Sequence, residues 1–267
     1  MSRLSTAIEA RLREGKKILS IYLPAGFPQP EATVPLMQAI AGAGADVIEL
    51  GVPFSDPLAD GPTIQAASQR ALQAGMTLKK TLERLRAFKQ QHNGVPVLLM
   101  GYANPFMRFG WDALFREARA AGADGFIVPD LPPEESADLQ RRAAELDLDW
   151  IHLVSPNTPV HRIEQIDRQS SGFVYAVSVT GVTGVRDRLP DSTRQFLQRL
   201  REQTTKPVLV GFGVSGPEMA RQLARYCDGV IVGSAVIREI EAAAHLDEAI
   251  RRVRQFVAAI RGALSEA

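Results

Sequence analysis

The segment Ala45-Asp46-Val47-Ile48-Glu49-Leu50-Gly51-Val52 shows most directly how this chain is built. Small residues end a helical stretch, an aspartate follows, and a short apolar run rich in β-branched residues then begins. The same three-part unit recurs at Ala123-Asp124-Gly125 and at Cys227-Asp228-Gly229. Its spacing is irregular, which excludes a solenoid repeat. We therefore expect helices and strands to alternate along the chain.

Eight short apolar runs are predicted strands, at 18–23, 47–52, 95–100, 125–128, 150–154, 173–179, 208–210 and 229–232. Stretches with helical periodicity lie between them, among them 78–91, 111–121, 134–146, 192–202 and 217–226. Several of these helices carry start signals. The expected N-caps are Thr77, Asp112 and Asp191, together with a capping box formed by Ser215 and Glu218.

Alternating strands and helices require parallel pairing with right-handed crossovers. Eight such units in about 250 residues predict an α/β fold, a single (β/α)8 TIM barrel that spans residues 1–267 as one domain. Segment 2–15 precedes the first strand and is expected to form an extra N-terminal helix that covers the bottom of the barrel. An open doubly wound sheet is the alternative.

Composition narrows the range of partners. The 31 Lys and Arg residues nearly balance the 30 Asp and Glu residues and are scattered, which favours neither nucleic acid nor a membrane surface as a partner. The single cysteine, Cys227, cannot form an internal disulfide, and the sequence shows neither a leader nor an apolar run of about 18 residues. We expect a cytoplasmic protein.

The sharpest chemical signal is a carboxylate inside the second apolar run. Glu49 shares a strand face with Val47 and Gly51, and Glu is seldom buried unless it is paired or used. The alternative is a Glu that faces solvent or pairs with an Arg. The proline-rich segment 53–62 follows, and its Asp60 is either a functional carboxylate or the N-cap of a helix that begins at Pro62.

Glycines gather after the sixth, seventh and eighth runs, in Gly181-Val182-Thr183-Gly184, Gly211-Phe212-Gly213 and Gly233-Ser234. Exposed backbone N–H groups and a helix start near Ser234 would make an anion cradle, and barrels commonly bind phosphate there. Apolar and aromatic residues at or near the strand ends would form a pocket wall or, singly, ordinary core. These residues are Tyr22, Met100, Tyr102, Ile127, Leu153, Tyr175 and Phe212.

The residue inventory disfavours other mechanisms. None of the six lysines stands at the carboxyl end of a predicted strand, where a Schiff-base mechanism would need a buried amine. The four histidines lack paired ligand spacing, so no metal site is predicted, and His152 is expected to be a packed structural residue. Carboxylate acid–base chemistry on a phosphorylated substrate remains.

Taken together, the motifs resemble those of the α subunit of tryptophan synthase. The resemblance runs from Leu4 to Ile240. It rests on Tyr22-Leu23-Pro24-Ala25-Gly26, on Glu49 to Pro57 with Ala59-Asp60-Gly61-Pro62, on Gly101-Tyr102-Ala103-Asn104-Pro105, and on the three glycine motifs. It implies a (β/α)8 lyase that cleaves indole-3-glycerol phosphate to indole and glyceraldehyde 3-phosphate.

The resemblance also implies roles for residues. Glu49 would be the general acid and base, and Asp60 would hold the indole N–H. Tyr22, Met100, Tyr102, Ile127, Leu153, Tyr175, Thr183 and Phe212 would bind the substrate, and Gly184, Gly213, Gly233 and Ser234 its phosphate. Segments 53–60 and 180–190 would be loops that close over the substrate.

The resemblance further implies a partner. The chain would carry no cofactor and would join a pyridoxal-phosphate β subunit in an α2β2 heterotetramer. Two alternatives stay open at this point. One is a free-standing lyase that releases indole, and the other is a barrel that has lost catalysis and only binds or regulates, although the presence of both carboxylates argues against the latter.

Overall fold

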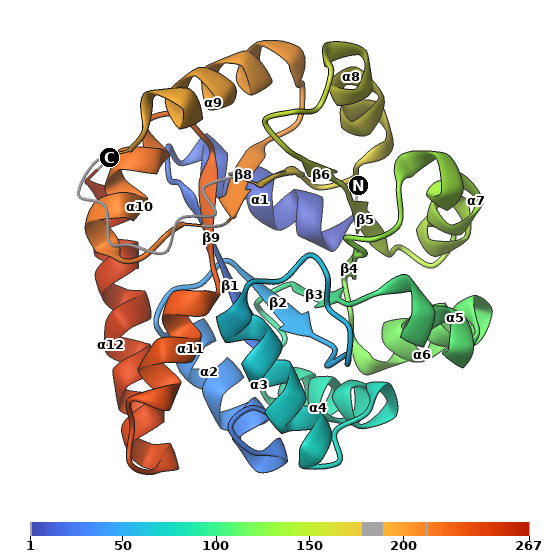
Figure 1. Cartoon of the computed structure of the whole chain (residues 1–267), viewed down its shortest axis with the longest axis vertical. Helices are drawn as coiled ribbons and strands as arrows, with labels where there is room; N and C mark the ends of the chain where they lie inside the picture. Colours follow the sequence, from blue (N-terminus) through green and yellow to red (C-terminus); the bar gives the residue numbers. More distant parts are fainter. Residues whose placement is uncertain (1, 178–188, 212, 267) are drawn as a thin grey trace.

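A closed parallel barrel is the core of the fold. The computed structural model describes residues 2–177, 189–211 and 213–266. Its strands form one parallel sheet in the order β5-β4-β3-β2-β1-β9-β8-β7-β6. β5 and β6 are consecutive in the chain and only His152 separates them, so the two ends of this order meet and the helices surround the sheet (Figure 1). The (β/α)8 prediction is confirmed, and the open doubly wound alternative is wrong.

The strands are β1 (Ile18–Pro24), β2 (Val47–Gly51), β3 (Val97–Met100), β4 (Gly125–Ile127), β5 (Asp149–Ile151), β6 (Leu153–Val154), β7 (Val174–Val177), β8 (Val208–Gly211) and β9 (Gly229–Val232). The helices are α1 (Arg3–Arg13), the 3-10 turn η1 (Pro30–Ala32), α2 (Thr33–Gly42), α3 (Pro62–Gln73), α4 (Leu78–Gln91), α5 (Ala103–Phe109), α6 (Trp111–Ala121), α7 (Pro133–Ala144), α8 (Val160–Gln169), α9 (Asp191–Gln203), α10 (Pro217–Ala224), α11 (Ser234–Glu241) and α12 (Leu246–Ser265). Among the described helices, none is both long and apolar enough to cross a membrane.

The fifth predicted strand is split into β5 and β6. The backbone N–H groups of Trp150 and His152 donate to the hydroxyls of Ser171 (2.8 Å) and Ser170 (3.2 Å). At these two positions the backbone N–H groups bind serine hydroxyls and not the carbonyl groups of a neighbouring strand. The regular hydrogen bonding of the sheet is interrupted there. The sequence pattern alone did not indicate this break, because the apolar run continues through it.

The recurring aspartates tie neighbouring strands together at the amino end of the barrel. In each unit the carboxylate accepts a hydrogen bond from a backbone N–H at the start of another strand: Asp46 from Leu19 (2.8 Å), Asp124 from Val97 (2.7 Å) and Asp228 from Val208 (2.8 Å). A buried N–H without a partner is costly, so a carboxylate at this place satisfies an amide that the sheet leaves open.

The start signals of the helices were only partly correct. Thr77 caps α4 by accepting from the N–H of Lys80, as expected. Asp112 and Asp191 lie within the first turns of α6 and α9, whose N-caps are Gly110 and Pro190. The predicted box at Ser215 is also wrong, because α10 has Gly216 as its N-cap. Acids inside a first turn are still favourable, because they face the positive end of the helix dipole.

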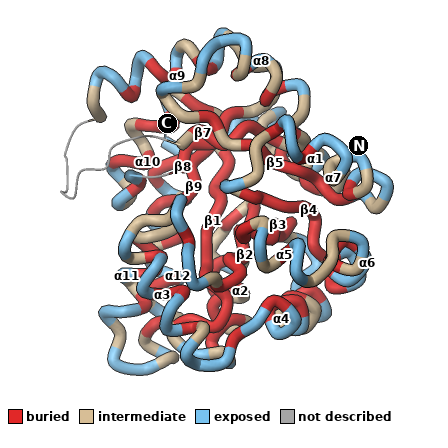
Figure 2. Tube along the Cα trace, turned by 45° about the vertical axis from the view of Figure 1, so that its right-hand side comes forward, coloured by how far each residue is buried: buried red, intermediate tan, exposed pale blue. Residues whose placement is uncertain are grey.

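Helix α1 lies across the amino ends of the strands, as the sequence predicted. Its Leu4 and Ile8 are fully buried in the core, and its Arg11 donates to Asp46 (2.6 Å) just before β2. The strands are buried except for the half-buried Leu153 and Val177, whereas the outer helices alternate between buried and exposed residues (Figure 2). The bottom of the barrel is therefore closed, and the opposite end, where the strands finish, is left for a site.

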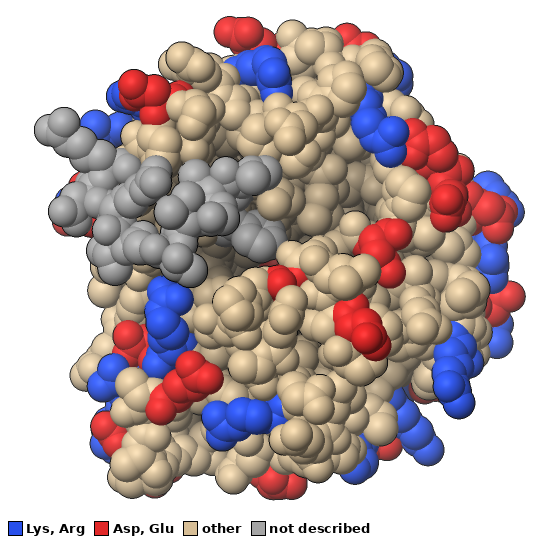
Figure 3. All heavy atoms as spheres, in the orientation of Figure 1, with Lys and Arg blue, Asp and Glu red and all other residues tan. Residues whose placement is uncertain are grey.

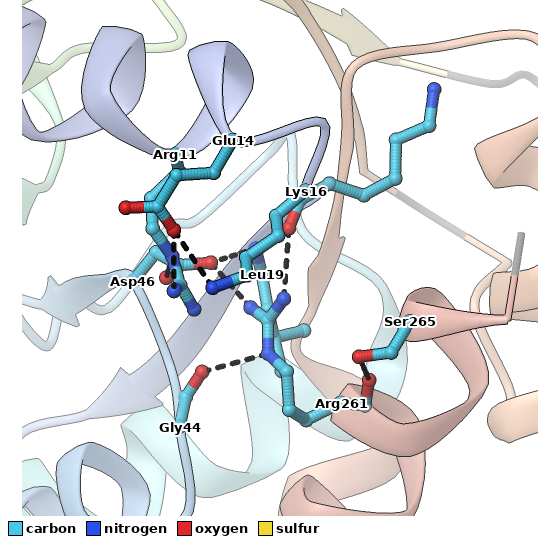
Figure 4. A network of polar contacts seen from close by, with 9 residues as sticks. Arg11, Glu14, Lys16, Leu19, Gly44, Asp46, Arg261 and Ser265 are labelled. Atoms are coloured by element: carbon cyan, nitrogen blue, oxygen red, sulfur yellow. Dashed lines mark hydrogen bonds and ion pairs between the residues drawn. The ribbon is translucent and has the colours of Figure 1, made fainter.

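Asp46 is the centre of the polar network in Figure 4. Its carboxylate accepts from Arg11, from Arg261 of α12 and from the backbone N–H of Leu19. Arg261 also donates to the carbonyl of Gly44 (3.0 Å), so the last helix is fastened to the first strands. The Asp46 side chain is only 9% exposed, so its charge depends on these partners.

Replacing Asp46 with Ala is expected to lower the free energy of unfolding by about 2–3 kcal/mol, because two arginines and one backbone N–H lose a largely buried partner. The urea midpoint, measured with an unchanged slope, tests this. Asp138→Ala is the matched control: Asp138 pairs with Arg141 and Arg142, but its side chain is 64% exposed. The control should change the free energy by less than about 0.5 kcal/mol. Equal losses in both variants would contradict the argument.

Candidate active site

Glu49 lies inside the barrel, in the middle of β2. All five residues of this strand are buried, and Glu49 is 0% exposed. Its neighbours in the sheet register are Tyr22 on β1 and Leu98 on β3. Its Oε1 accepts a hydrogen bond from the hydroxyl of Ser20 (2.7 Å), and its Oε2 is buried without a hydrogen-bond partner among the described residues. The alternatives of a solvent-facing or salt-bridged Glu are wrong.

Burial controls the proton of Glu49. Loss of hydration raises the pKa of this carboxyl to about 8, and the hydrogen bond from Ser20 opposes the rise. Near neutral pH the group is therefore mostly protonated, and it can give a proton and take one back.

Asp60 is held over the same end of the barrel by Tyr102. The Tyr102 hydroxyl donates to Oδ2 of Asp60 (2.9 Å) and accepts from the N–H of Ala59 (3.1 Å). The Tyr102 ring packs on Phe54, with centroids 5.3 Å apart. Tyr102 thus contacts the segment between β2 and α3 at three places. Asp60 is not a helix cap, because Gly61 is the N-cap of α3.

The two carboxyl groups differ in protonation. Burial raises the pKa of Asp60 to about 6, while the hydrogen bond from Tyr102 lowers it, so Asp60 is mostly ionised at neutral pH. Glu49 and Asp60 also both raise the pKa of Tyr22 and of Tyr175, after the larger effect of burial, so the four groups lie near one another. One neutral and one charged carboxyl in a single pocket are suited to separate roles in proton transfer.

The predicted pocket wall forms from residues that share the inner face of the sheet. Met100 is the register partner of Ile127, and Leu153 is the register partner of Tyr175. Tyr22, Met100, Ile127 and Tyr175 are buried, and Leu153 is half-buried. Phe212 and Thr183 lie outside the described residues. The described members thus share the inner face of the barrel with Glu49, and their contact with a substrate stays a prediction.

Two glycines make room for the tyrosines. A Cβ atom at Gly51 would lie 2.3 Å from the Tyr22 hydroxyl, and one at Gly211 would lie 2.3 Å from the Tyr175 hydroxyl. Because real Cβ contacts are never so short, each phenol occupies space that only glycine leaves free. Part of the glycine signal at these strand ends therefore reports the packing of aromatic rings.

Gly51→Ala is expected to displace the Tyr22 ring and to lower the free energy of unfolding by about 1–3 kcal/mol through overpacking. Gly42→Ala is the control, because a Cβ there meets nothing within 4 Å and Ala favours the helix. Urea unfolding and the near-ultraviolet tyrosine signal of both variants test this. If Gly51→Ala is as stable as the wild type and its tyrosine signal is unaltered, the close contact does not constrain the pocket.

The expected phosphate cradle is described in part. Gly213 follows β8 with a φ of +82°, a left-handed conformation that favours glycine. Gly233 is the N-cap of α11, and Ser234 is its first residue. Gly184 lies outside the described residues. The described half offers backbone N–H groups at adjoining strand ends, as an anion site requires, and its ligand stays a prediction.

His152 has a structural role, as expected. It is buried, its Nε2 lies 2.7 Å from Nε2 of Gln140, and loss of hydration lowers its pKa to about 4. Within the described ranges, no three His, Cys, Asp or Glu residues are grouped so that they could hold a metal ion.

Sequence reasoning missed Ser20. It stands two residues before Tyr22, on the same inner face of β1, and it supplies the hydrogen bond to Glu49. A signal was available in the sequence. Ser20 is a polar residue within an apolar run, and the alternation of side chains along that strand places it on the inner face, as it does Glu49.

Comparison with known proteins places the chain in a family. The family model described as tryptophan synthase alpha chain matches residues 8–265. The chain belongs to the tryptophan synthase alpha chain family. The tryptophan synthase alpha chain of Roseiflexus castenholzii is 45% identical over 263 residues, which cover 98% of this chain and 100% of that protein. The corresponding protein of Azoarcus is 44% identical over 264 residues, which cover 99% of this chain and 97% of that protein.

Solved structures of tryptophan synthase agree with this assignment. The alpha subunit from Legionella pneumophila superposes with a TM-score of 0.93 at 38% identity, and the match covers 100% of both chains. A chain of tryptophan synthase from Mycobacterium tuberculosis has a TM-score of 0.89 at 37% identity, with 98% of both chains covered. As a member of the tryptophan synthase alpha chain family, the chain is a lyase of tryptophan biosynthesis.

Proposed function

We propose that this chain cleaves indole-3-glycerol phosphate to indole and glyceraldehyde 3-phosphate by a retro-aldol reaction. The observation that carries the proposal is geometric: Glu49 is fully buried inside the barrel, and Tyr102 holds a second carboxyl group, Asp60, at the carboxyl end of the strands. The raised pKa values of both groups, about 8 and about 6, agree with it. A retro-aldol step on an indole needs a proton delivered to carbon and a negative charge near a transient ring cation. The family assignment supports the same reaction.

Glu49 acts as acid and then as base. It gives its proton to carbon 3 of the indole ring, which makes the ring an electron acceptor. As the bond between carbon 3 and the glycerol chain breaks, its electron pair restores the ring, and the glycerol hydroxyl becomes the aldehyde by giving its proton to Glu49. The carboxyl group ends the cycle protonated, as it began.

Asp60 stabilises the intermediate cation. Its Oδ2 is held by Tyr102, and its Oδ1 is buried without a partner among the described residues, which leaves an oxygen to accept the indole N–H. A fixed carboxylate needs little reorganisation when positive charge develops on the ring.

The remaining residues bind the two ends of the substrate. The indole would lie against Tyr22, Met100, Ile127, Leu153 and Tyr175. The phosphate would bind the N–H groups near Gly213, Gly233 and Ser234. Thr183, Gly184 and Phe212 complete the proposed set. This division matches an apolar wall inside the barrel and a helix amino end beside it.

The partner in this proposal is a β subunit that carries pyridoxal phosphate and receives indole in a cytoplasmic α2β2 complex; this chain itself needs no cofactor. Large exposed apolar side chains among the described residues support a docking surface at the carboxyl end of the barrel. Leu58 follows β2, Met107 is on α5 after β3, and Val160 begins α8 after β6; they are 91%, 63% and 44% exposed. Single exposed apolar residues are ordinary on protein surfaces, so the support for a docking surface is the position of all three in segments that follow strand ends.

Charge argues against nucleic acid as the partner on the face shown in Figure 3. There Lys and Arg side chains lie mainly toward the rim and alternate with Asp and Glu, so the described part of this face has no continuous basic patch. A phosphate backbone would require one.

Indole formation from indole-3-glycerol phosphate tests the proposal, measured for the purified chain with and without a tryptophan synthase β subunit. We expect weak cleavage by the chain alone and a rise of orders of magnitude in the complex, because a docked partner favours closed loops over the site. Full activity without the partner would identify a free-standing lyase. Absence of cleavage in both conditions would overturn the proposed reaction.

A further inference from the structure

We propose that Ser20 is a positioning residue for Glu49: it holds Oε1 of the carboxyl group and leaves Oε2 as the one oxygen that carries the proton. The inference rests on the proposed function, since it concerns the acid and base of that reaction. It adds a residue that acts through Glu49 and does not belong to the expected set of site residues.

The geometry comes from the register of three strands. Ser20 on β1 is paired with Val47 on β2 and with Ile231 on β9, and its side chain shares the inner face of the barrel with that of Glu49. Both residues are 0% exposed, and the distance from Oγ to Oε1 is 2.7 Å. A bond between two fully buried groups on neighbouring strands is rigid, because neither side chain can turn toward solvent.

The two oxygens of Glu49 are therefore different. Oε1 has the Ser20 hydroxyl as a partner, whereas Oε2 is buried without one among the described residues. An unpaired buried oxygen is costly in the charged form and less so as a protonated hydroxyl. The proton of the neutral carboxyl is thus expected on Oε2, while Ser20 donates to Oε1.

The same arrangement serves both halves of the reaction. When Oε2 gives its proton to carbon 3, the carboxylate becomes charged and its hydrogen bond from Ser20 becomes charge-assisted and stronger. When Oε2 then accepts the proton of the glycerol hydroxyl, the bond returns to its first state. Ser20 gives up no proton at any step; it keeps the carboxyl group from rotating while the proton on Oε2 is exchanged.

Among the described residues, only Ser20 donates a hydrogen bond to the carboxyl group of Glu49. The phenols of Tyr22 and Tyr175 interact electrostatically with Glu49, but both have pKa values raised well above the ordinary range and stay neutral. Asp60 acts on the same two phenols and carries a negative charge of its own. The pKa of Glu49 has two causes, burial and the Ser20 hydroxyl. Within the described part of the chain, no cation contributes to it.

The test compares Ser20→Ala, Ser20→Cys and Ser20→Thr in complex with the β subunit, through kcat, KM and the pH dependence of kcat/KM. Ala removes the hydroxyl, Cys keeps a similar volume with a weak donor, and Thr keeps the hydroxyl. Glu49 must start protonated, so activity falls as pH rises through its pKa. Loss of a bond that favours the charged form raises that pKa and moves the basic limb to higher pH.

For Ser20→Ala we expect the basic limb to move up by about one pH unit and kcat to fall about tenfold, with little change in KM. Cys should resemble Ala, and Thr should resemble the wild type. A variant that only loosened the barrel would lose kcat without a shift of the limb, and urea unfolding identifies any that fails to fold. If one variant does not fold, the others are still tested by infrared spectroscopy. The carboxyl stretching band of Glu49, identified by its absence in Glu49→Gln, is followed against pH and gives the pKa of Glu49 directly.

The outcomes separate the two proposals. Suppose that the wild type is active. If the basic limb of the pH profile of kcat/KM is the same in Ser20→Ala as in the wild type, or if the Ala and Thr variants behave alike, the role of Ser20 is overturned and the proposed function is not. Absence of cleavage by the wild-type complex would overturn the proposed function and the role of Ser20 with it.

Discussion

Glu49→Gln is expected to lower the rate of indole formation by about 10³-fold or more in the complex with the β subunit. Gln has nearly the same shape, and its amide oxygen can still accept the hydrogen bond from Ser20. The amide, however, can neither protonate carbon 3 nor accept the hydroxyl proton. The loss should therefore appear in kcat, with a small change in KM, because the binding groups are unchanged.

One control and one further variant make the result specific. The control, Glu145→Gln, removes an acid that pairs with Arg141 and is 63% exposed, and it should keep the wild-type rate. Asp60→Asn keeps a hydrogen-bond acceptor for the indole N–H but loses the charge, so a loss of about 10²-fold is expected. Binding of the β subunit by Glu49→Gln shows that the variant is folded. A rate within a few-fold of the wild type for Glu49→Gln would contradict acid–base catalysis by this residue and favour a non-catalytic barrel.

The second large effect concerns stability. Burial raises the pKa of Glu49 from 4.5 to about 8 in the folded chain. The folded state thus holds a proton that the unfolded state has released, so the wild type loses stability as pH rises from about 5 to about 8. Relative to the wild type, Glu49→Gln should become more stable across this window, by roughly 3–5 kcal/mol above pH 8.

Urea unfolding of both proteins at intervals from pH 5 to pH 9 measures this difference. The amide also has a constant cost, because its NH₂ group is buried where Oε2 lacks a partner, so the test is the change with pH and not the offset. Other shifted groups, such as His152 and Asp149, titrate equally in both proteins and cancel. A difference that does not vary with pH would show that the carboxyl of Glu49 titrates as it does in the unfolded chain.

The raised pKa of Glu49 affects both proton transfer and stability. A carboxyl that is neutral at pH 7 because it is buried is useful as a proton donor and unfavourable once it is ionised. If Glu49 acts as proposed, the chain gives up stability for a catalytic group, as strained or buried active sites commonly do. The hydrogen bond from Ser20 limits this loss, because it stabilises the charged form of Glu49.

Much of the fold could be predicted from the sequence, because the relevant signals are local. Alternating apolar runs and helical stretches identified the barrel, and the run with Glu49 at its centre already marked an inward carboxylate. Residue parity along a strand decides which side chains share a face, and a parallel barrel puts all strand ends on one side. The inner positions of Tyr22, Met100, Ile127 and Tyr175 followed from that rule alone.

Errors arose where the choice depended on partners distant in the chain. The break at His152 needs the hydroxyls of Ser170 and Ser171, about twenty residues later in the sequence. The N-caps of α6 and α9, Gly110 and Pro190, lie two positions and one position before the predicted caps, because local side-chain signals compete with packing. The recurring aspartates were visible as a motif, but only the barrel shows that each one binds the backbone of another strand.

The sequence by itself determined the barrel, the two carboxylates and the glycine-rich strand ends, because periodicity and residue type suffice for them. The tertiary structure alone decided the protonation of those carboxylates. Burial of Glu49 against Ser20, and the reach of Tyr102 across 42 residues to Asp60, set two pKa values apart in one pocket. Dehydration and hydrogen bonding depend on which atoms meet in space, and no local pattern along the chain contains that information.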